Sequence, residues 1–194
     1  LVKVYKNTKV DAQMLKDADV DAVILAIGSS PITIKLEGMD KLQHASAPEV
    51  LRHEVCPKGK VAVIGGGLVG LETADTLATD GCDVTVLEMK DEIGSDLGSL
   101  RKIAVMMKLQ QMQVKMLPNG KVCKFTEEGI VLEDETLVPC NCAVFAVGFA
   151  SNDSHLLVEE CEKRQIPCRV IGDAKSARRA LDAIAEGFEA ARTL

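Results

Sequence analysis

The chain has 194 residues, of which 47% are hydrophobic, 27% charged and 3% aromatic, and its formal net charge at pH 7 is −6. This length allows one large domain or two small ones, and the few aromatic residues favour an aliphatic core, as in a parallel sheet covered by helices. The acidic balance, without a long block of Lys or Arg, argues against nucleic acid as a partner, because nucleic-acid binding depends on a basic surface.

The apolar segments predict neither a membrane span nor a leader. The longest of them, Val61–Leu71, is too short and too rich in glycine to cross a bilayer, and the opening residues do not resemble a signal peptide. We therefore expect a cytoplasmic protein without membrane contact. The chain begins with Leu1 and enters a strand-like stretch at once, which indicates a piece of a longer protein.

The cysteines predict neither a disulfide framework nor a metal site. Their number is odd, no two form a C-x-x-C pair, and Cys140 and Cys142 are too close together for the usual zinc spacing. We expect buried free thiols. The seven cysteines are Cys56, Cys82, Cys123, Cys140, Cys142, Cys161 and Cys168.

The residues before Lys60 predict short elements separated by loops. The run D-A-V-I-L-A-I, which ends at Gly28, is typical of a buried strand. The expected elements are a strand at Val2–Tyr5, a short helix capped by Asp11, a strand at Asp21–Ile27, a loop at Ser29–Asp40 and a short helix at Ala47–Val55.

From Lys60 to Glu88 the pattern predicts a βαβ unit. A short β-branched strand, Val61–Ile64, leads into a glycine turn, and apolar residues at helical spacing follow until Gly81. The next strand, Val84–Leu87, closes on Glu88. The length and order of these pieces match a βαβ unit.

The remaining residues predict a helix, a β-meander and a return to α/β structure. The strand Ala143–Val147 ends in A-V-G at Gly148, as the earlier strand ends in A-I-G at Gly28. The other expected elements are a helix at Leu97–Met112, strands at Val114–Met116, Lys121–Thr126, Ile130–Glu133 and Arg169–Ile171, and a helix at Ser176–Thr193 with an apolar face of Ala177, Ala180, Leu181, Ile184 and Phe188.

The glycine turn satisfies the dinucleotide fingerprint G-x-G-x-x-G, with a strand before it, a helix after it and an acidic residue at the end of the next strand. The first glycine permits the tight turn, the second lets a pyrophosphate approach the backbone, and the third lets helix and strand pack closely. Free amide groups at the positive helix end attract the phosphates. The motif consists of Gly65, Gly66, Gly67, Leu68, Val69 and Gly70.

Two glutamates near this motif are candidate site residues. Glu88 follows Gly70 by 18 positions, where a carboxylate accepts hydrogen bonds from the adenosine ribose and repels a 2′-phosphate. We therefore expect NADH rather than NADPH, although Lys90 weakens the repulsion. Glu72 is expected in the first helical turn, either as a helix-dipole partner or near the nicotinamide. The three histidines have no triad partners in the sequence, and we assign them no catalytic role.

The order of these pieces resembles that of flavoprotein reductases with two dinucleotide-binding domains. The segment V-L-E-M-K-D-E-I-G-S-D-L-G-S-L-R-K (Val86–Lys102) and the ending that starts I-G-D-A-K-S-A-R-R at Ile171 are most similar to the old yellow enzyme-like NADH:flavin oxidoreductases. This group includes 2-enoate reductases, 2,4-dienoyl-CoA reductases and trimethylamine dehydrogenase.

The resemblance implies an α/β fold in which a Rossmann-like NAD(P)H-binding domain with a ββα-type meander is inserted into a partial FAD-binding domain. Residues 1–54 and 151–194 would be parts of the FAD-binding domain, and residues 55–150 the NADH-binding domain. By the same resemblance Gly172 and Asp173 bind the ribityl and phosphate region of FAD, Gly28 and Gly148 lie at the nucleotide edges of the two domains, and the last helix faces the flavin.

The chain departs from that group by omission. It contains no second G-x-G-x-x-G, no FMN-binding barrel and no cysteine cluster for an iron–sulfur centre. The resemblance therefore implies a fragment of a parent enzyme that passes hydride from NADH to FAD and electrons through the iron–sulfur cluster to FMN, which reduces an activated C=C bond. We expect no catalytic residue in this chain, NADH as its small-molecule nucleotide and the rest of the flavoenzyme as its partner; a homo-oligomer stays open.

Three alternatives remain at this point. A pyridine nucleotide-disulfide reductase has the same two-domain architecture, and although this chain lacks the C-x-x-C of thioredoxin reductase-like members, other members carry their cysteines in a part that is not present. A non-catalytic NADH sensor would need an output element, and the acidic balance offers no basic DNA-binding region. A structural Rossmann domain with an empty site is disfavoured because Gly67 and Glu88 are both retained.

Overall fold

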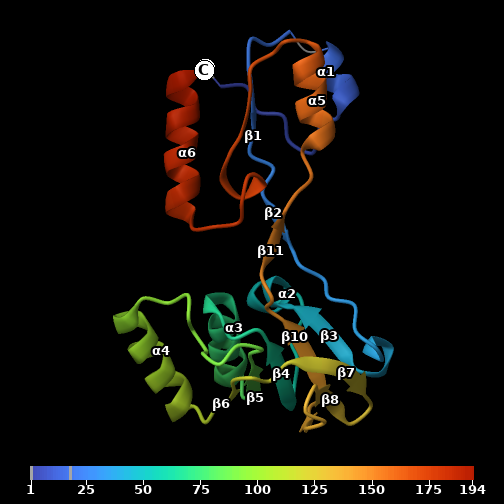
Figure 1. Ribbon diagram of the computed structural model, residues 1–194, viewed down its shortest axis with the longest axis vertical. Helices are drawn as coiled ribbons and strands as arrows, with labels where there is room; N and C mark the ends of the chain where they lie inside the picture. The colour runs from blue at the N-terminus through green and yellow to red at the C-terminus, as the bar shows by residue number, and fades with distance from the viewer. Residues whose placement is uncertain (1, 18) are drawn as a thin grey trace. The chain divides into compact units, whose positions relative to one another are not determined.

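The computed structural model describes residues 2–17 and 19–194, which form two compact units, Pro31–Gly148 and Leu1–Ser30 with Phe149–Leu194 (Figure 1). The first division between the two units lies after Ser30. The reason is that β3 (Gln43–Ser46) pairs in parallel with β10 (Cys142–Phe145), which ties the residues before Lys60 to the larger sheet.

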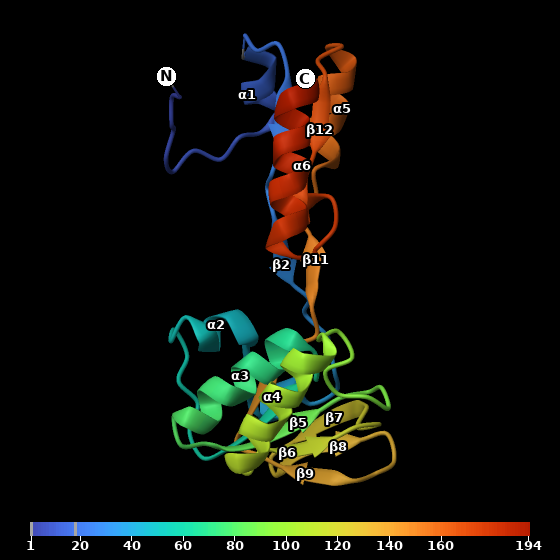
Figure 2. The same cartoon turned by 90° about the vertical axis from the view of Figure 1, so that its left-hand side faces the viewer.

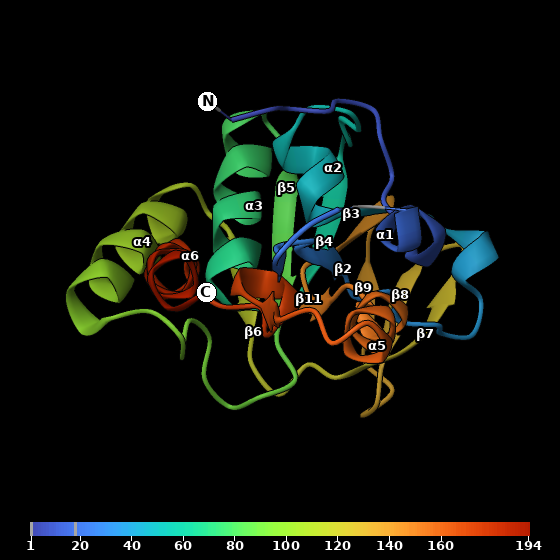
Figure 3. The same cartoon turned by 90° about the horizontal axis from the view of Figure 1, so that it is seen from above.

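The larger unit contains a five-stranded parallel sheet in the order β3-β10-β4-β5-β6. Figure 2 shows α3 and α4 side by side, and Figure 3 shows α2 beside α3. The elements added to β3 and β10 are α2 (Ala47–Leu51), β4 (Lys60–Ile64), α3 (Leu68–Thr79), β5 (Asp83–Leu87), α4 (Ser99–Gln111) and β6 (Lys115–Leu117).

The two faces of this sheet pack against different layers because side chains alternate along a strand. Val61 and Val63 of β4 belong to the core formed with the helices, whereas Ala62 and Ile64 belong to the core formed with an antiparallel meander. The meander consists of β7 (Val122–Thr126), β8 (Gly129–Leu132) and β9 (Leu137–Pro139), and it contributes Phe125, Ile130, Leu132 and Val138 to that second core.

The smaller unit is built around two parallel strands, β1 (Val23–Leu25) and β12 (Cys168–Val170). Helix α1 (Ala12–Asp17) lies beside α5 (His155–Lys163), which also contacts β12. The remaining elements are β2 (Ser29–Pro31), which pairs with β11 (Phe149–Ser151), the 3-10 turn η2 (Gly172–Ala174) and α6 (Ala180–Thr193). A further 3-10 turn, η1 (Met39–Lys41), lies in the larger unit.

The α/β fold class and the βαβ unit predicted from the sequence are confirmed, as is the cap of α1, where the amide N–H of Met14 donates to the Asp11 carboxylate over 2.8 Å. The predicted strand at Val2–Tyr5 is wrong. These residues form no strand, and the side chains of Val2 and Tyr5 are 91% and 75% exposed. A strand needs a hydrogen-bonded neighbour, and local alternation alone does not supply one.

The last helix differs from its prediction in two ways. It begins at Ala180 and not at Ser176, and its apolar face is exposed, with exposed fractions of 76%, 69% and 71% for Leu181, Ile184 and Phe188.

Within the described residues, no helix has the length and hydropathy that a membrane span requires.

Candidate functional site

The glycine turn follows the carboxyl end of the central strand β4 and precedes α3. The amide N–H of Gly65 donates to Leu87 O over 2.8 Å, which draws the turn toward the end of β5. Gly65 has φ +109°, and a β-carbon there would lie 2.4 Å from Ala146 O. The first position of the motif therefore accepts only glycine, and the turn lies at the sheet edge where open α/β sheets bind ligands.

The third glycine of the motif brings α3 close to the strand that precedes it. A β-carbon on Gly70 would lie 1.9 Å from Gly65 O and 3.5 Å from the Ala146 side chain. Leu68 and Val69 form the first turn of α3 and are partly buried. The roles predicted for Gly65 and Gly70 thus have a direct steric basis.

The second half of the turn is covered by residues that follow β5. A β-carbon on Gly66 would lie 3.0 Å from the β-carbon of Glu88 and 3.2 Å from Ile93, and a β-carbon on Gly67 would lie 3.1 Å from an Asp96 carboxylate oxygen. The amide N–H of Gly94 donates to Gly66 O over 2.7 Å. The segment from residue 88 to residue 96 therefore wraps closely over the turn.

The Glu88 carboxylate reaches into this turn from the end of β5. One oxygen accepts the Gly66 N–H over 2.7 Å, and the other accepts the Lys90 N–H over 3.0 Å. The side chain is half-buried. Each carboxylate oxygen can accept a further hydrogen bond, so Glu88 remains able to bind a pair of hydroxyl groups beside the turn.

Asp96 is a site residue that sequence reasoning missed. The amide N–H of Leu68, at the first position of α3, donates to both carboxylate oxygens of Asp96 over 3.1 and 3.0 Å. The two residues are 28 positions apart, a separation for which no local capping rule exists. A negative charge thus lies at the positive end of α3.

Glu72 lies in α3 at the fifth position, so the expectation of a first-turn residue is wrong. The helix begins at Leu68, and Gly67 before it is extended. The Glu72 carboxylate pairs with Arg101 of α4 over 2.8 Å, and Asp75 pairs with Lys108 over 2.6 Å. These two ion pairs connect α3 to α4, which gives Glu72 a structural contact.

The smaller unit brings together three of the predicted residues that are far apart in the sequence. Gly28, with φ +73°, follows β1, and Gly172 and Asp173 follow the neighbouring strand β12. They line a cavity of about 330 Å³ together with Ala26, Ile171, Arg178, Ala180 and Ala183. Asp173 accepts a hydrogen bond from the Ser29 hydroxyl over 3.1 Å, so its side chain is held by the segment that follows Gly28.

Glu186 of α6 fixes the turn at Gly172. Its carboxylate accepts the Gly172 N–H over 2.7 Å and also pairs with Arg178 and Lys175. The hydrogen bond from Arg178, followed by that from Gly172, lowers the pKa of the Glu186 carboxyl to about 2. The resemblance did not identify Glu186 or Arg178, because their partners lie eight to 14 residues away along the chain.

Gly148 belongs to the larger unit, and its carbonyl oxygen accepts the Ile32 N–H over 3.0 Å. It follows β10 at the same sheet edge as the glycine turn, since the Ala146 N–H donates to Ile64 O over 2.8 Å. Its φ of +104° favours glycine at this position.

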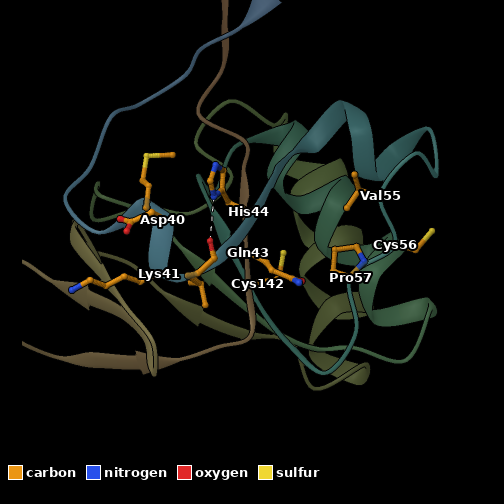
Figure 4. Close-up of a pocket in the computed structure, with 10 residues that line it drawn as sticks. Asp40, Lys41, Gln43, His44, Val55, Cys56, Pro57 and Cys142 are labelled. Carbon is orange, nitrogen blue, oxygen red and sulfur yellow. Dashed lines mark hydrogen bonds between the residues drawn. The ribbon is translucent and has the colours of Figure 1, made fainter.

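A second cavity, of about 520 Å³, lies at the amino ends of β3 and β10 (Figure 4). The glycine turn follows the carboxyl end of β4, so this cavity is a separate site. His44 in its wall donates from Nδ1 to Leu42 O over 3.2 Å. Burial raises the pKa of the Cys142 thiol to about 11. The Cys142 thiol is therefore protonated at neutral pH.

The cysteines are free thiols in the structure, and three of them, Cys140, Cys142 and Cys161, are buried, whereas Cys56 and Cys123 are exposed. Burial, followed by the neighbouring Cys142, raises the pKa of Cys140 to about 11. Among residues 2–17 and 19–194, no group of His, Cys, Asp and Glu side chains is arranged to hold a metal ion.

Comparison with known proteins shows similarity to reductases. The chain is 36% identical over 191 residues to the bilirubin reductase of Mediterraneibacter gnavus, covering 95% of this chain and 29% of that protein. It is 33% identical over 201 residues to the cinnamate reductase of Clostridium sporogenes, covering 100% of this chain and 29% of that protein. The chain thus spans less than a third of the length of these relatives.

The fold is also that of a solved enzyme structure. A 2-naphthoyl-CoA reductase in complex with 2-naphthoyl-CoA matches with a TM-score of 0.84 at 24% sequence identity, over 97% of this chain and 29% of that chain. The family model for pyridine nucleotide-disulphide oxidoreductases matches residues 2–174. The chain therefore belongs to the pyridine nucleotide-disulphide oxidoreductase family, whose fold binds FAD and NAD(H).

Proposed function

We propose that the larger unit binds NADH at the glycine turn. The observation that carries this proposal is the contact between Glu88 and Gly66, which places a carboxylate inside the turn at the end of β5. The pyrophosphate would be held by the amide groups at the start of α3, and the ribose hydroxyls by Glu88. A 2′-phosphate on that ribose would meet the Glu88 charge, so NADH is preferred to NADPH.

The smaller unit would hold part of FAD. This proposal is supported by Gly28, Gly172 and Asp173, which line one cavity, in a family whose fold binds FAD. The chain has no second G-x-G-x-x-G, so the phosphate-binding loop for FAD would come from the rest of the parent enzyme. NADH, when bound, would supply a hydride to FAD, and the residues of this chain would bind and orient the nucleotide.

We further propose that the parent enzyme reduces an activated C=C bond. The cinnamate reductase supports this, because cinnamate carries a double bond conjugated to a carboxylate. FMN and an iron–sulfur cluster would be bound outside this chain. We expect the isolated chain to lack enoate reductase activity, and turnover of cinnamate with NADH by the purified chain would contradict that expectation.

A disulfide reductase is the second candidate function, favoured by the description of the family that the chain matches. This chain lacks the C-x-x-C pair of thioredoxin reductase-like members, so a disulfide reductase of this kind would be one whose redox-active cysteines lie outside this chain. Both candidates require the same NADH site, so the first experiment is directed at that site.

The test is a calorimetric titration of the purified chain with NADH and NADPH, repeated on Glu88→Ala and Glu88→Gln. Loss of hydrogen bonds to a charged acceptor is expected to weaken NADH binding by about tenfold or more in Glu88→Ala. NADPH is expected to bind weakly to the unchanged chain, and the preference for NADH should shrink in Glu88→Ala because the repelling charge is gone. Glu88→Gln keeps one acceptor oxygen, so its NADH affinity is expected to lie between those of the unchanged chain and of Glu88→Ala. Glu127→Ala, an exposed residue in the meander turn, is the control. Unchanged NADH affinity in Glu88→Ala would contradict the proposal.

A further inference from the structure

The start of α3 already carries an anion that belongs to the chain. The Asp96 carboxylate accepts the Leu68 N–H with both oxygens, over 3.1 and 3.0 Å. Leu68 is the first residue of α3, and Gly67 before it is extended. Free amide groups at such a helix end, together with the helix dipole, attract phosphate groups. Asp96 therefore lies where the NADH pyrophosphate is proposed to bind.

The position of Asp96 is fixed by the segment that carries it. Ile93 is buried 3.2 to 3.3 Å from the position of a β-carbon on Gly66, and the Gly94 N–H donates to Gly66 O over 2.7 Å. A further turn forms as the Leu97 N–H donates to Gly94 O over 3.1 Å. Asp96 itself is exposed between these two anchors.

We propose that Asp96 is an affinity-determining residue that competes with the dinucleotide phosphates for the start of α3. This inference rests on the proposed NADH site. Two anions cannot share one N–H donor, so the Asp96 side chain must release Leu68 before a phosphate oxygen can accept from it. The free energy of the lost Asp96–Leu68 contact is subtracted from the free energy of NADH binding. NADH therefore binds more weakly than it would to the same glycine turn without Asp96.

The competition is specific to phosphate. An adenosine without phosphates would bind through its ribose at Glu88, whose carboxylate accepts from the Gly66 and Lys90 amide groups, and it has no phosphate to place at the Leu68 N–H. Replacing Asp96 should therefore tighten the binding of ADP and NADH and leave that of adenosine unchanged. A general gain in affinity, shared by adenosine, would come from another cause.

The test compares Asp96→Asn, Asp96→Ala and the unchanged chain by calorimetric titration with NADH, ADP and adenosine at low ionic strength. Asn keeps a neutral acceptor that can still cap the helix, so the fold is maintained. Asp91→Asn is the matched control, because it removes one negative charge from another exposed residue of the same segment. Circular dichroism establishes that each variant is folded.

We expect Asp96→Asn to lower the Kd of NADH and of ADP by roughly three- to tenfold. Asp96→Ala should lower these Kd values by at least as much, and Asp91→Asn should leave them close to those of the unchanged chain. Equal or weaker NADH binding in Asp96→Asn would overturn the inference while the unchanged chain still binds NADH and the proposed function stands. A gain of the same size for adenosine would also overturn it. If neither the unchanged chain nor any variant binds a nucleotide, the proposed function and the inference fail together.

Discussion

Single glycines in the turn differ in what a β-carbon would meet. At Gly70 it would lie 1.9 Å from a backbone oxygen, which cannot rotate away, whereas at Gly98 it would meet nothing within 4 Å. Gly98 also has φ −65°, which any residue adopts. Glycine is therefore required at Gly70 and not at Gly98, although both lie in a glycine-rich region.

Gly70→Ala is expected to destabilise the fold by about 1–3 kcal/mol, because overpacking against backbone must shift α3 or β4. The same shift should weaken NADH binding by about tenfold or more. Urea unfolding and NADH titration measure the two effects. Gly98→Ala is the control and should change neither; a Gly70→Ala variant with unchanged stability would contradict the packing described here.

Glu186 gives a prediction for the pH dependence of stability. Its pKa is lowered from 4.5 to about 2, first by the hydrogen bond from Arg178. A carboxyl whose pKa is lower in the folded state stabilises the fold fully above its unfolded pKa and loses this effect as the pH falls through its folded pKa. Glu186→Gln should therefore lower the free energy of unfolding at pH 7, and the difference from the unchanged chain should shrink between pH 4.5 and pH 2. Urea titrations across this range measure it, and a constant difference would contradict the assignment.

Among the secondary-structure elements, those with a strong period could be predicted from the sequence. Strands β4 and β5 are apolar and β-branched, and α3 repeats apolar residues at helical spacing. Strand β3, with the sequence QHAS, has no such signal and forms because it pairs with β10. Helix α5 was missed although Asp153 accepts the His155 N–H at its start, a capping signal that the sequence contains.

The contact between α3 and α4 decides the interpretation of Glu72. Arg101 and Glu72 have side chains that are 59% and 47% exposed, so Arg101→Ala should change the free energy of unfolding by only about 0.2–1 kcal/mol. NADH affinity should stay within about twofold, because the ion pair links two helices and does not touch the glycine turn. Lys108→Ala should cost more stability, since Asp75 already has one buried oxygen without a partner among the described residues. A large loss of NADH affinity in Arg101→Ala would instead place Glu72 at the nucleotide.

For the whole molecule, the sequence identified the parts of the site that follow a local motif. The glycine turn and Glu88 are separated by one βαβ unit of regular length, so their meeting could be predicted. The contact of Asp96 with Leu68, and that of Glu186 with Gly172, depend on how a loop or a helix returns to an earlier turn. The spacing of residues along the chain does not predict such long-range contacts.

The chain is expected to bind FAD weakly, because it lacks a second glycine fingerprint and its smaller unit has two parallel strands at the proposed FAD cavity. The measurement is the FAD content of the purified protein after dialysis, read from its visible absorption. Stoichiometric FAD that survives dialysis would show that the described residues suffice for binding and would contradict this expectation.

The most direct test of the NADH site is an NMR titration of the isotope-labelled chain with NADH, which reports binding at each backbone amide. We expect the largest shifts at Gly66, Gly67 and Leu68, together with Lys90, whose N–H donates to Glu88. Shifts concentrated instead around His44 and Cys56, in the cavity at the amino ends of β3 and β10, would place the nucleotide there and contradict an NADH site at the glycine turn.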